Sequence, residues 1–338
     1  MSGKAWVTML LAVVFLGGCG GPQSPFTKQV DKVEKYSDKG DEWFNQGDMP
    51  RATREFDRAL TLSRNMDYQP GVARQLNNLG AVALEQGDLT LARELFTRAW
   101  EVNRSRGSWA EASTNQANLA TVAQQAGDQD AVIRHLTQAE DAARWSRDKG
   151  ALARSYVRWS GWALDQLDFS RAESYLKLAK RLARTPSLKA AVAFQQGRLA
   201  LARSDAQGAA LHLTRALEGD RWLQDRAAMA ADLYYLGEAY RLRRDWPRAF
   251  RYYVRAFDVY ASLGRRAQLQ ECLARLKEVN REGYLNQPLE RESLAKSPEG
   301  LKQEDLNWLV KRVEELESEN EWLKKELRYL EYQGETEL

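Results

Sequence analysis

The sequence predicts an all-α protein: a solenoid of about six stacked helix pairs, followed by a C-terminal coiled-coil helix. The first observation behind this prediction is a repeat of about 40 residues, marked by six regularly spaced aspartates. The second is a set of small and bulky apolar residues at fixed distances from each aspartate. The third is a heptad pattern of leucines near the C-terminus. A fixed period of this size is typical of stacked repeats, which mainly present surface.

Each repeat has the same internal pattern. A glycine, alanine or serine lies eight residues before the aspartate, a bulky apolar residue lies eight after it, and an alanine lies eleven after it. We expect the small residue to let two helices approach closely. The aspartate follows a turn and is expected to cap the second helix, because a carboxylate is favoured at a helix N-terminus. The aspartates are Asp48, Asp88, Asp128, Asp168, Asp205 and Asp245.

The repeat resembles the tetratricopeptide repeat (TPR) family. The resemblance is clearest in the sixth copy, which contains Leu233, Leu236, Gly237, Tyr240, Ala249, Tyr253 and Ala256 at the spacing of that family's pattern. Leu167 and Ser204 replace the turn glycine in weaker copies. The period exceeds the family's usual 34 residues, which implies helices about a turn longer. We expect six TPR-like repeats in residues 33–265 and a capping helix in residues 266–282.

The resemblance also implies a binding surface. In this family the first helix of each pair lines a concave groove, and an open trough is expected here. Asparagine and arginine on adjacent helices are suited to holding a peptide backbone or carboxylate, although they also fit an ordinary solvated surface. The residues carried over to the groove are Asn77, Asn78, Asn118, Arg154, Arg158, Gln195, Arg198, Tyr234 and Arg241.

The N-terminus has the features of an export signal. Lys4 precedes an apolar run that is too short to span a bilayer, and the run ends at Cys19 in a motif that resembles the lipobox of bacterial lipoproteins. The resemblance implies that residues 1–19 form a signal peptide, that Cys19 carries acyl chains, and that residues 20–32 form a tether. Gly20 after the cysteine favours the periplasmic face of the outer membrane. The alternative is an ordinary secretory signal with an incidental cysteine.

The C-terminal part has a different pattern. Residues 283–302 contain prolines, glycines and charges and are expected to be a linker; residues 303–333 form a predicted coiled coil, and residues 334–338 a short tail. Leucine at one core position and a single asparagine at the other predict a parallel two-stranded coil, and therefore self-association. The predicted core residues are Leu306, Leu309, Val313, Leu316, Asn320, Leu323, Leu327 and Leu330.

Motifs for catalysis or cofactor binding are not visible. His135 and His212 lie in different repeats without metal-ligand spacing, and no phosphate-binding loop or nucleophile motif is present. Cys272 lies in a helical pattern and is expected to be a buried, inert thiol. We therefore expect no metal, no cofactor and no enzymatic activity. The arginines form no concentrated block, so nucleic acid is not an expected partner.

These observations favour a lipid-anchored scaffold that binds another envelope protein or peptide in its groove. Assembly of a pilus, a secretion machine or an exported polymer is the process expected by analogy with other lipidated repeat proteins. The alternative is a regulatory lipoprotein that senses a peptide or a cell-wall fragment. Residues 301–338 carry 11 acidic and 6 basic side chains within a total charge of +3, so the repeats and linker are basic, which favours acidic peptides or anionic lipid.

Overall fold

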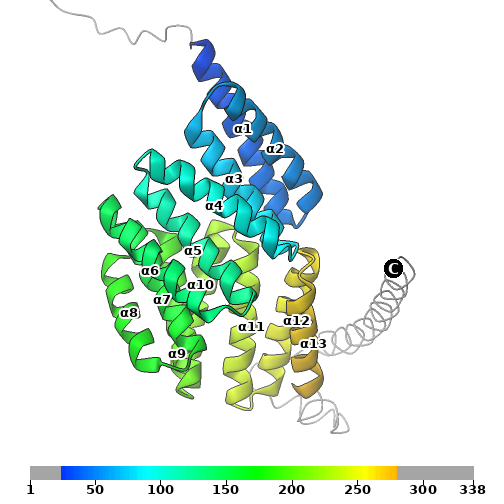
Figure 1. The fold of residues 1–338 in the computed structure, drawn as a ribbon. Helices are drawn as coiled ribbons and strands as arrows, with labels where there is room; N and C mark the ends of the chain where they lie inside the picture. The colour runs from blue at the N-terminus through cyan, green and yellow to red at the C-terminus, as the bar shows by residue number, and fades with distance from the viewer. Residues whose placement is uncertain (1–23, 280–338) are drawn as a thin grey trace, which may run out of the picture. The chain divides into compact units, whose positions relative to one another are not determined.

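The computed structural model describes residues 24–279 of the 338-residue chain, and these form consecutive α-helices without a strand in that range (Figure 1). The predicted stack of helix pairs is confirmed. Cys19 and the predicted linker, coiled coil and tail lie outside the described residues. The helices are α1 (Pro25–Gln46), α2 (Met49–Asn65), α3 (Gln69–Glu85), α4 (Leu89–Ser105), α5 (Trp109–Gln125), α6 (Gln129–Ser146), α7 (Lys149–Asp165), α8 (Phe169–Leu182), α9 (Pro186–Ala202), α10 (Ala206–Leu223), α11 (Arg226–Leu242), α12 (Trp246–Ser262) and α13 (Arg266–Val279).

The six repeated aspartates begin the even-numbered helices. Each is the N-cap of its helix, and its side chain accepts a hydrogen bond from a backbone N–H in the first turn. In α2, for example, Asp48 Oδ1 lies 2.9 Å from the nitrogen of Arg51. This bond satisfies one of the N–H groups that a helix start leaves without a partner. The predicted capping role is confirmed.

The residue before each capping aspartate adopts the left-handed conformation. Glycine occupies this position in the first three repeats, with φ between 75° and 83°, whereas Leu167, Ser204 and Arg244 hold it at φ of 57° to 59° in the next three. A side chain makes this conformation unfavourable. The later repeats therefore fold despite local strain, because the packing of the flanking helices fixes the turn.

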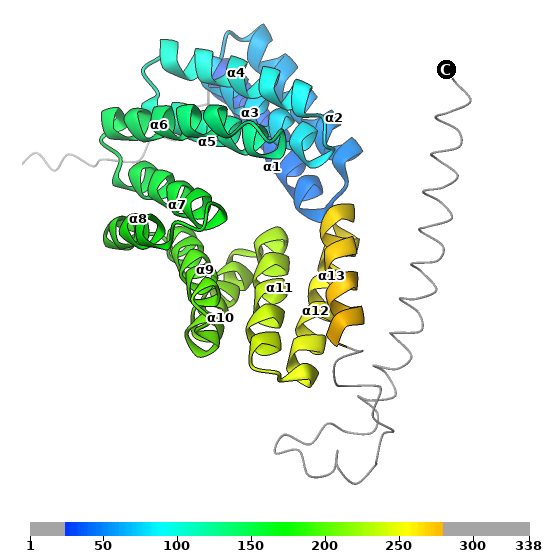
Figure 2. The same cartoon turned by 60° about the horizontal axis from the view of Figure 1, so that its bottom comes forward.

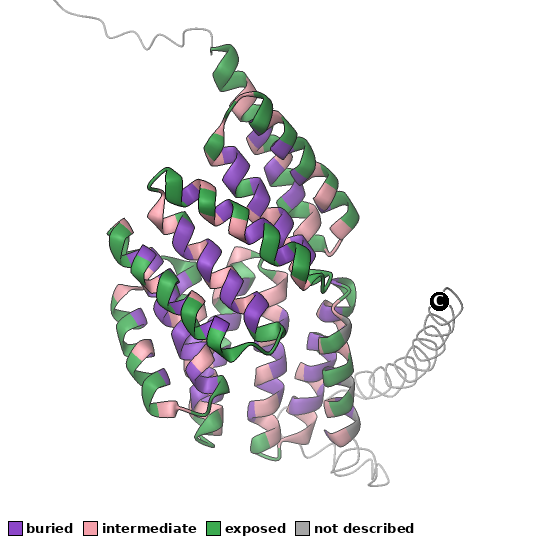
Figure 3. Ribbon diagram, in the orientation of Figure 1, coloured by how far each residue is buried: buried purple, intermediate pink, exposed green. Residues whose placement is uncertain are grey.

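The small residue of each repeat packs against the bulky one sixteen positions later. A Cβ added at Gly80 would lie 2.8 Å from the ring of Phe96, and one added at Gly237 would lie 2.6 Å from the ring of Tyr253. Phe96 and Tyr253 are fully buried. These contacts build the core between the two helices of each pair, where buried positions line the facing sides (Figure 3).

The odd-numbered helices lie on the inner side of the curved stack. Besides its sequence neighbours, α3 packs against α1 and α5, α7 against α5 and α9, and α9 against α11. Elements on the inside of a curve approach one another more closely than those outside it. Figure 2 shows α7 and α11 facing the middle of the arc, with α8 on its outside.

Two features differ from the sequence expectations. Helix α1 begins at Pro25, inside the predicted tether of residues 20–32, because Ser24 caps the helix and proline suits its first position. The expected open trough is also wrong at its ends, since the turn after α12 returns to the first two repeats. Glu85 of α3 pairs with Arg265, just before α13, over 2.7 Å, and the two ends lie side by side in Figure 2.

Candidate partner-binding surface

A cavity of about 210 Å³ opens on the inner surface between α5, α7 and α9. Three residues of the predicted groove line it: Arg158 on α7, and Gln195 and Arg198 on α9. Apolar side chains of α5 and α6 form its floor. The other polar or aromatic lining residues are Thr121, Gln124, Trp162 and Asp165.

Arg198 and Asp165 form an ion pair within this cavity. The Arg198 guanidinium lies 2.6 Å from Asp165 Oδ1, and Gln124 donates to the other carboxylate oxygen over 2.6 Å. Arg198 also lies 5.5 Å from the ring centroid of Tyr235. Burial opposes the charge of Arg198, but Tyr235 and Asp165 more than offset it, so the pKa of the guanidinium lies above its ordinary value. The pair is therefore a fixed part of the cavity wall.

Arg158 has no such partner. Among the described residues no carboxylate pairs with its guanidinium, although the side chain lines the same cavity. Arg158 is exposed to solvent, and the neighbouring helices lower the pKa of its guanidinium by removing part of its hydration. With Asp165 neutralised by Arg198, the cavity has one uncompensated positive charge. An anionic group of a ligand would pair with it.

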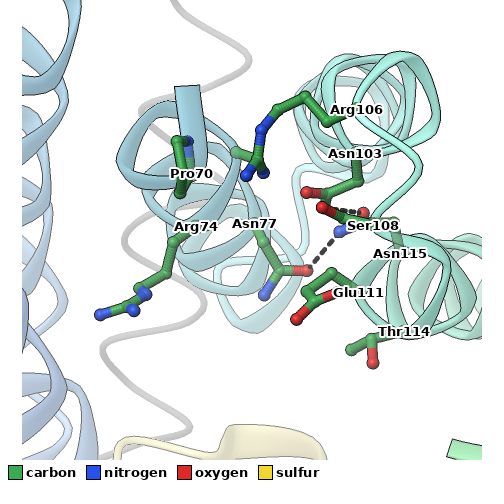
Figure 4. Close-up of a pocket in the computed structure, with 10 residues that line it drawn as sticks. Pro70, Arg74, Asn77, Asn103, Arg106, Ser108, Glu111, Thr114 and Asn115 are labelled. Carbon is green, nitrogen blue, oxygen red and sulfur yellow. Dashed lines mark hydrogen bonds between the residues drawn. The ribbon is translucent and has the colours of Figure 1, made fainter. Parts of the chain in front are cut away.

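A second cavity, of about 270 Å³, lies between α3 and α5 near the α4–α5 turn (Figure 4). Its wall contains a chain of amides. Asn103 donates to Asn115 over 2.8 Å, Asn115 donates to Asn77 over 3.0 Å, and Asn118 donates to the same Asn77 oxygen over 2.9 Å. These bonds fix the orientation of the predicted groove residues Asn77 and Asn118.

Two charged side chains line this second cavity without an ion-pair partner among the described residues. Arg106 reaches over the cavity from the end of α4, and Glu111 approaches it from the first turn of α5 (Figure 4). Arg74 lies on the far side and pairs with Glu34 of α1. The cavity thus offers a free cation, a free carboxylate and oriented amides.

The remaining predicted groove residues lie elsewhere. The side-chain nitrogen of Asn78 lies 3.5 Å from Oδ1 of Asp41 on α1. Arg154 is exposed on α7 and does not line either of the two cavities. Tyr234 is not part of an open surface: it is buried, and its hydroxyl donates to Glu271 of α13 over 2.7 Å. Arg241 pairs with Glu238 over 2.7 Å, in a cluster that also includes Arg275. Helix α13 therefore covers this end of the predicted groove.

Sequence reasoning missed several cavity residues. Asn103 and Arg106 belong to a second helix, and such helices were not expected at the groove. Thr121 and Asp165 lie on first helices, seven and three residues before the capping aspartate. Positions fourteen, ten, seven and three before that aspartate share one helical face, so following this face through every repeat would have found Thr121 and Asp165. It would not have found Asn103 and Arg106.

A comparison with known families matches residues 71–144 to the tetratricopeptide repeat. The match covers the second and third of the six helix pairs. The matched TPR segment runs from α3 through α6 and includes the amide chain of the second cavity. TPR units of this kind serve protein–protein interaction. A comparison with proteins of curated function found no match.

One solved structure matches this chain at a TM-score of 0.50 and shows the same fold, and two others are similar at lower scores. A signal transduction ATPase with a TPR sensor from Pyrococcus horikoshii is similar at 12% identity and a TM-score of 0.50; the match covers 81% of this chain and 43% of that chain, which is therefore much longer. A TPR protein from Parabacteroides merdae matches at 15% identity over 75% of this chain and 94% of its own, with a TM-score of 0.39. A yeast Sti1 TPR2AB domain in complex with an HSP90 peptide matches at 15% identity over 74% and 99%, with a TM-score of 0.32.

The described part of the chain holds no group of three or more histidine, cysteine or acidic side chains that could bind a metal ion. His135 Nδ1 instead lies 2.8 Å from Gln116 of α5, a packing contact between helices. Within residues 24–279, none of the helices combines the length and apolar character that crossing a membrane requires.

Proposed function

We propose that this chain is a non-enzymatic scaffold that binds an extended acidic segment of a partner protein on the inner surface of its repeats. The observation that carries the proposal is Arg158 in the cavity between α5, α7 and α9, since no carboxylate of the described residues pairs with it. Arg158 is exposed, so an anionic group that enters the cavity from solvent can reach its guanidinium. A carboxylate can accept two parallel hydrogen bonds from a guanidinium.

The polar wall beside Arg158 suits a peptide. Gln195 and Gln124 present amides from adjacent helices, and Trp162 adds an aromatic surface. Extended backbone needs alternating donors and acceptors, which amides supply. An acidic side chain of a bound peptide would pair with the Arg158 guanidinium. The peptide backbone beside it would form hydrogen bonds with the amides of Gln195 and Gln124.

The binding test uses a labelled twelve-residue peptide of alternating glutamate and serine, and a matched peptide with glutamine at each glutamate. The full chain in detergent should bind the acidic peptide. Arg158→Gln should weaken binding on the order of 10- to 100-fold, the loss expected for a charge-assisted hydrogen bond. Arg154→Gln removes a charge from the same helix outside the cavity and should change affinity less than twofold. Equal losses in both variants would contradict the site.

We further propose that acylated Cys19 anchors this scaffold to the periplasmic face of an outer membrane, where it supports assembly of an envelope machine such as a pilus, a secretion system or an exporter of polymer. The lipobox-like sequence before Cys19 supports the anchor. Cys19→Ser should move the protein from the membrane fraction to the soluble fraction, as judged by detergent partitioning. In-cell crosslinking should then capture the partner with the wild-type chain and not with Arg158→Gln.

A second candidate function is sensing of a small peptide or cell-wall fragment. The cavity between α3 and α5 favours it, because Arg106 and Glu111 are opposite charges beside oriented amides and have no ion-pair partner within residues 24–279. That arrangement suits a zwitterion such as a short peptide. A shift of the unfolding temperature with dipeptides, lost in Arg106→Gln and retained in Arg158→Gln, would favour sensing over the scaffold.

A further inference from the structure

The turn after α12 meets the first two repeats through a small set of residues at helix ends and turns, which we name the closing contact: Gly47, Glu85, Leu263 and Arg265. The ion pair between Glu85 and Arg265 spans 2.7 Å and joins residues 180 positions apart. Beside it, a Cβ added at Gly47 would lie 2.8 Å from the Cα of Leu263, so the two turns touch through their backbones. With this contact the stack of helix pairs closes into a ring around the inner surface, which stays open along the axis of the ring.

The closing contact is weaker than the other helix junctions. Each side chain of the ion pair keeps about a quarter of its surface exposed, 23% for Arg265 and 25% for Glu85. Ion pairs with this exposure contribute little to stability. Neighbouring helices along the chain, by contrast, bury apolar side chains such as Phe96 and Leu119 between them. We expect the first and last repeats to separate while each repeat remains folded, because solenoid stability depends on nearest-neighbour interfaces.

We propose that the closing contact controls access to the Arg158 cavity. This inference rests on the proposed function, since it concerns the same surface and the same acidic segment. When the contact is closed, a segment with a free end can enter along the axis of the ring, whereas a segment held between two folded domains cannot. When the contact opens, both kinds of segment can enter. The contact thus selects for chain ends, and its opening is the event that admits an internal segment.

The chain offers a matched pair of variants. Gly47 and Gly87 occupy the same turn position with φ of 83° and 82°. Alanine carries the same conformational strain at both positions. A Cβ at Gly47 collides with Leu263, whereas nothing lies within 4 Å of a Cβ at Gly87. Gly47→Ala should therefore open the contact, and Gly87→Ala should not. Glu85→Gln removes the ion pair, with Glu94→Gln as its control because Glu94 pairs within its own helix.

Hydrogen exchange tests the contact without any ligand. In the full chain in detergent, Gly47→Ala and Glu85→Gln should each increase exchange in the turn around residues 262–266 at least threefold, by raising the open population. Gly87→Ala and Glu94→Gln should leave that turn within about 1.5-fold of the wild type, the scatter expected for independent sites. Unchanged exchange in both test variants would overturn the closing contact.

Association kinetics test the selection. The glutamate–serine peptide is presented with one free end, or with a small folded domain at each end. The wild type should bind the free-ended form on the order of tenfold faster. Gly47→Ala should bring the two rates within about twofold of each other, and Gly87→Ala should keep the tenfold difference. Equal rates in the wild type overturn the access control while leaving the proposed binding site intact. If neither peptide binds, the proposed function fails and the access control with it, whatever the exchange experiment shows.

Discussion

Asp220 and Asp232 face each other inside the junction between α10 and α11, at the two positions where Asn103 and Asn115 share a 2.8 Å hydrogen bond in an earlier junction. Both aspartates are buried. As two carboxylates they would have acceptors and no donor, and both Asp232 oxygens lack a hydrogen-bond donor. A single shared proton supplies one. Burial, and then the negative charges of its neighbours Asp220 and Asp225, raise the pKa of Asp232.

Asp232→Asn should stabilise the protein at neutral and alkaline pH. A carboxyl with a raised pKa in the folded state contributes stability below its unfolded pKa of about 3.9, and that stability is lost as pH rises towards the folded pKa. The amide supplies a donor at every pH, as Asn115 does. Urea unfolding should give the variant an advantage on the order of 1–3 kcal/mol at pH 8 and little at pH 4. A difference that does not change with pH would contradict the shared proton.

Asn115→Asp is the matched converse. It places a single acid in the earlier junction, beside Asn103 and Asn77. We expect it to destabilise the protein progressively as pH rises. Burial disfavours the ionised form of the new carboxyl, and the neutral amide of Asn77 provides no positive charge to offset that cost. Asn115 and Asp232 hold the same position in their repeats. Comparing the two variants therefore separates the effect of a buried carboxyl from the effect of its position.

Leu167→Gly should stabilise the turn between α7 and α8. Leu167 has a φ of 58° and its side chain is 73% exposed, so its replacement removes strain and little packing. Glycine carries no penalty in this conformation, and the expected gain is about 1 kcal/mol in urea unfolding. Gly127→Ala at the equivalent turn should lose a similar amount. Loss of stability in Leu167→Gly would mean that the leucine packs more than its exposure indicates.

Gly80→Ala should be destabilising and its effect should depend on residue 96. The new Cβ would lie 2.8 Å from the Phe96 ring, which is too close without displacement. Overpacking of this kind costs about 1–3 kcal/mol. The third repeat holds Ala120 and Leu136 at the same two positions, so Phe96→Leu should recover part of the loss. A double-mutant cycle measured by urea unfolding should therefore show a favourable coupling energy on the order of 1 kcal/mol. Simple additivity would count against this packing rule.

Cys272 should be unreactive in the folded protein. The thiol is fully buried and burial raises its pKa to about 12, so almost no thiolate forms at pH 8. Maleimide labelling of Cys272, located by peptide mass spectrometry, should be at least 100-fold slower in the native state than in 6 M urea. Rapid native labelling would show that α13 separates from the stack.

The predicted coiled coil lies outside the described residues and remains a prediction. Leu316→Asp with Leu323→Asp places charges at two core positions of the heptad. If residues 303–333 form a parallel dimer, sedimentation should show the wild type as a dimer and this variant as a monomer, because a charge at a core position removes apolar contact from both chains. Asn320→Leu tests the register, since it should permit larger assemblies. A wild-type monomer would contradict the prediction.

The sequence by itself determined the repeat, the helix pairs and the turns. It could do so because a capping aspartate, a left-handed turn residue and a small-to-bulky contact are local features, and each is written within about 20 residues of chain. The same locality identified Arg158 and Arg198 as inner-surface residues, since they lie on the exposed face of first helices.

Only the tertiary structure decided which of these residues have partners. Whether Arg158 is unpaired while Arg198 meets Asp165 depends on the angle between successive helix pairs, and the sequence pattern does not give that angle. Small rotations accumulate over six repeats and bring Glu85 to Arg265, a contact that no local pattern encodes. For the same reason Tyr234 was expected in an open groove, whereas the curvature of the stack and α13 bury it.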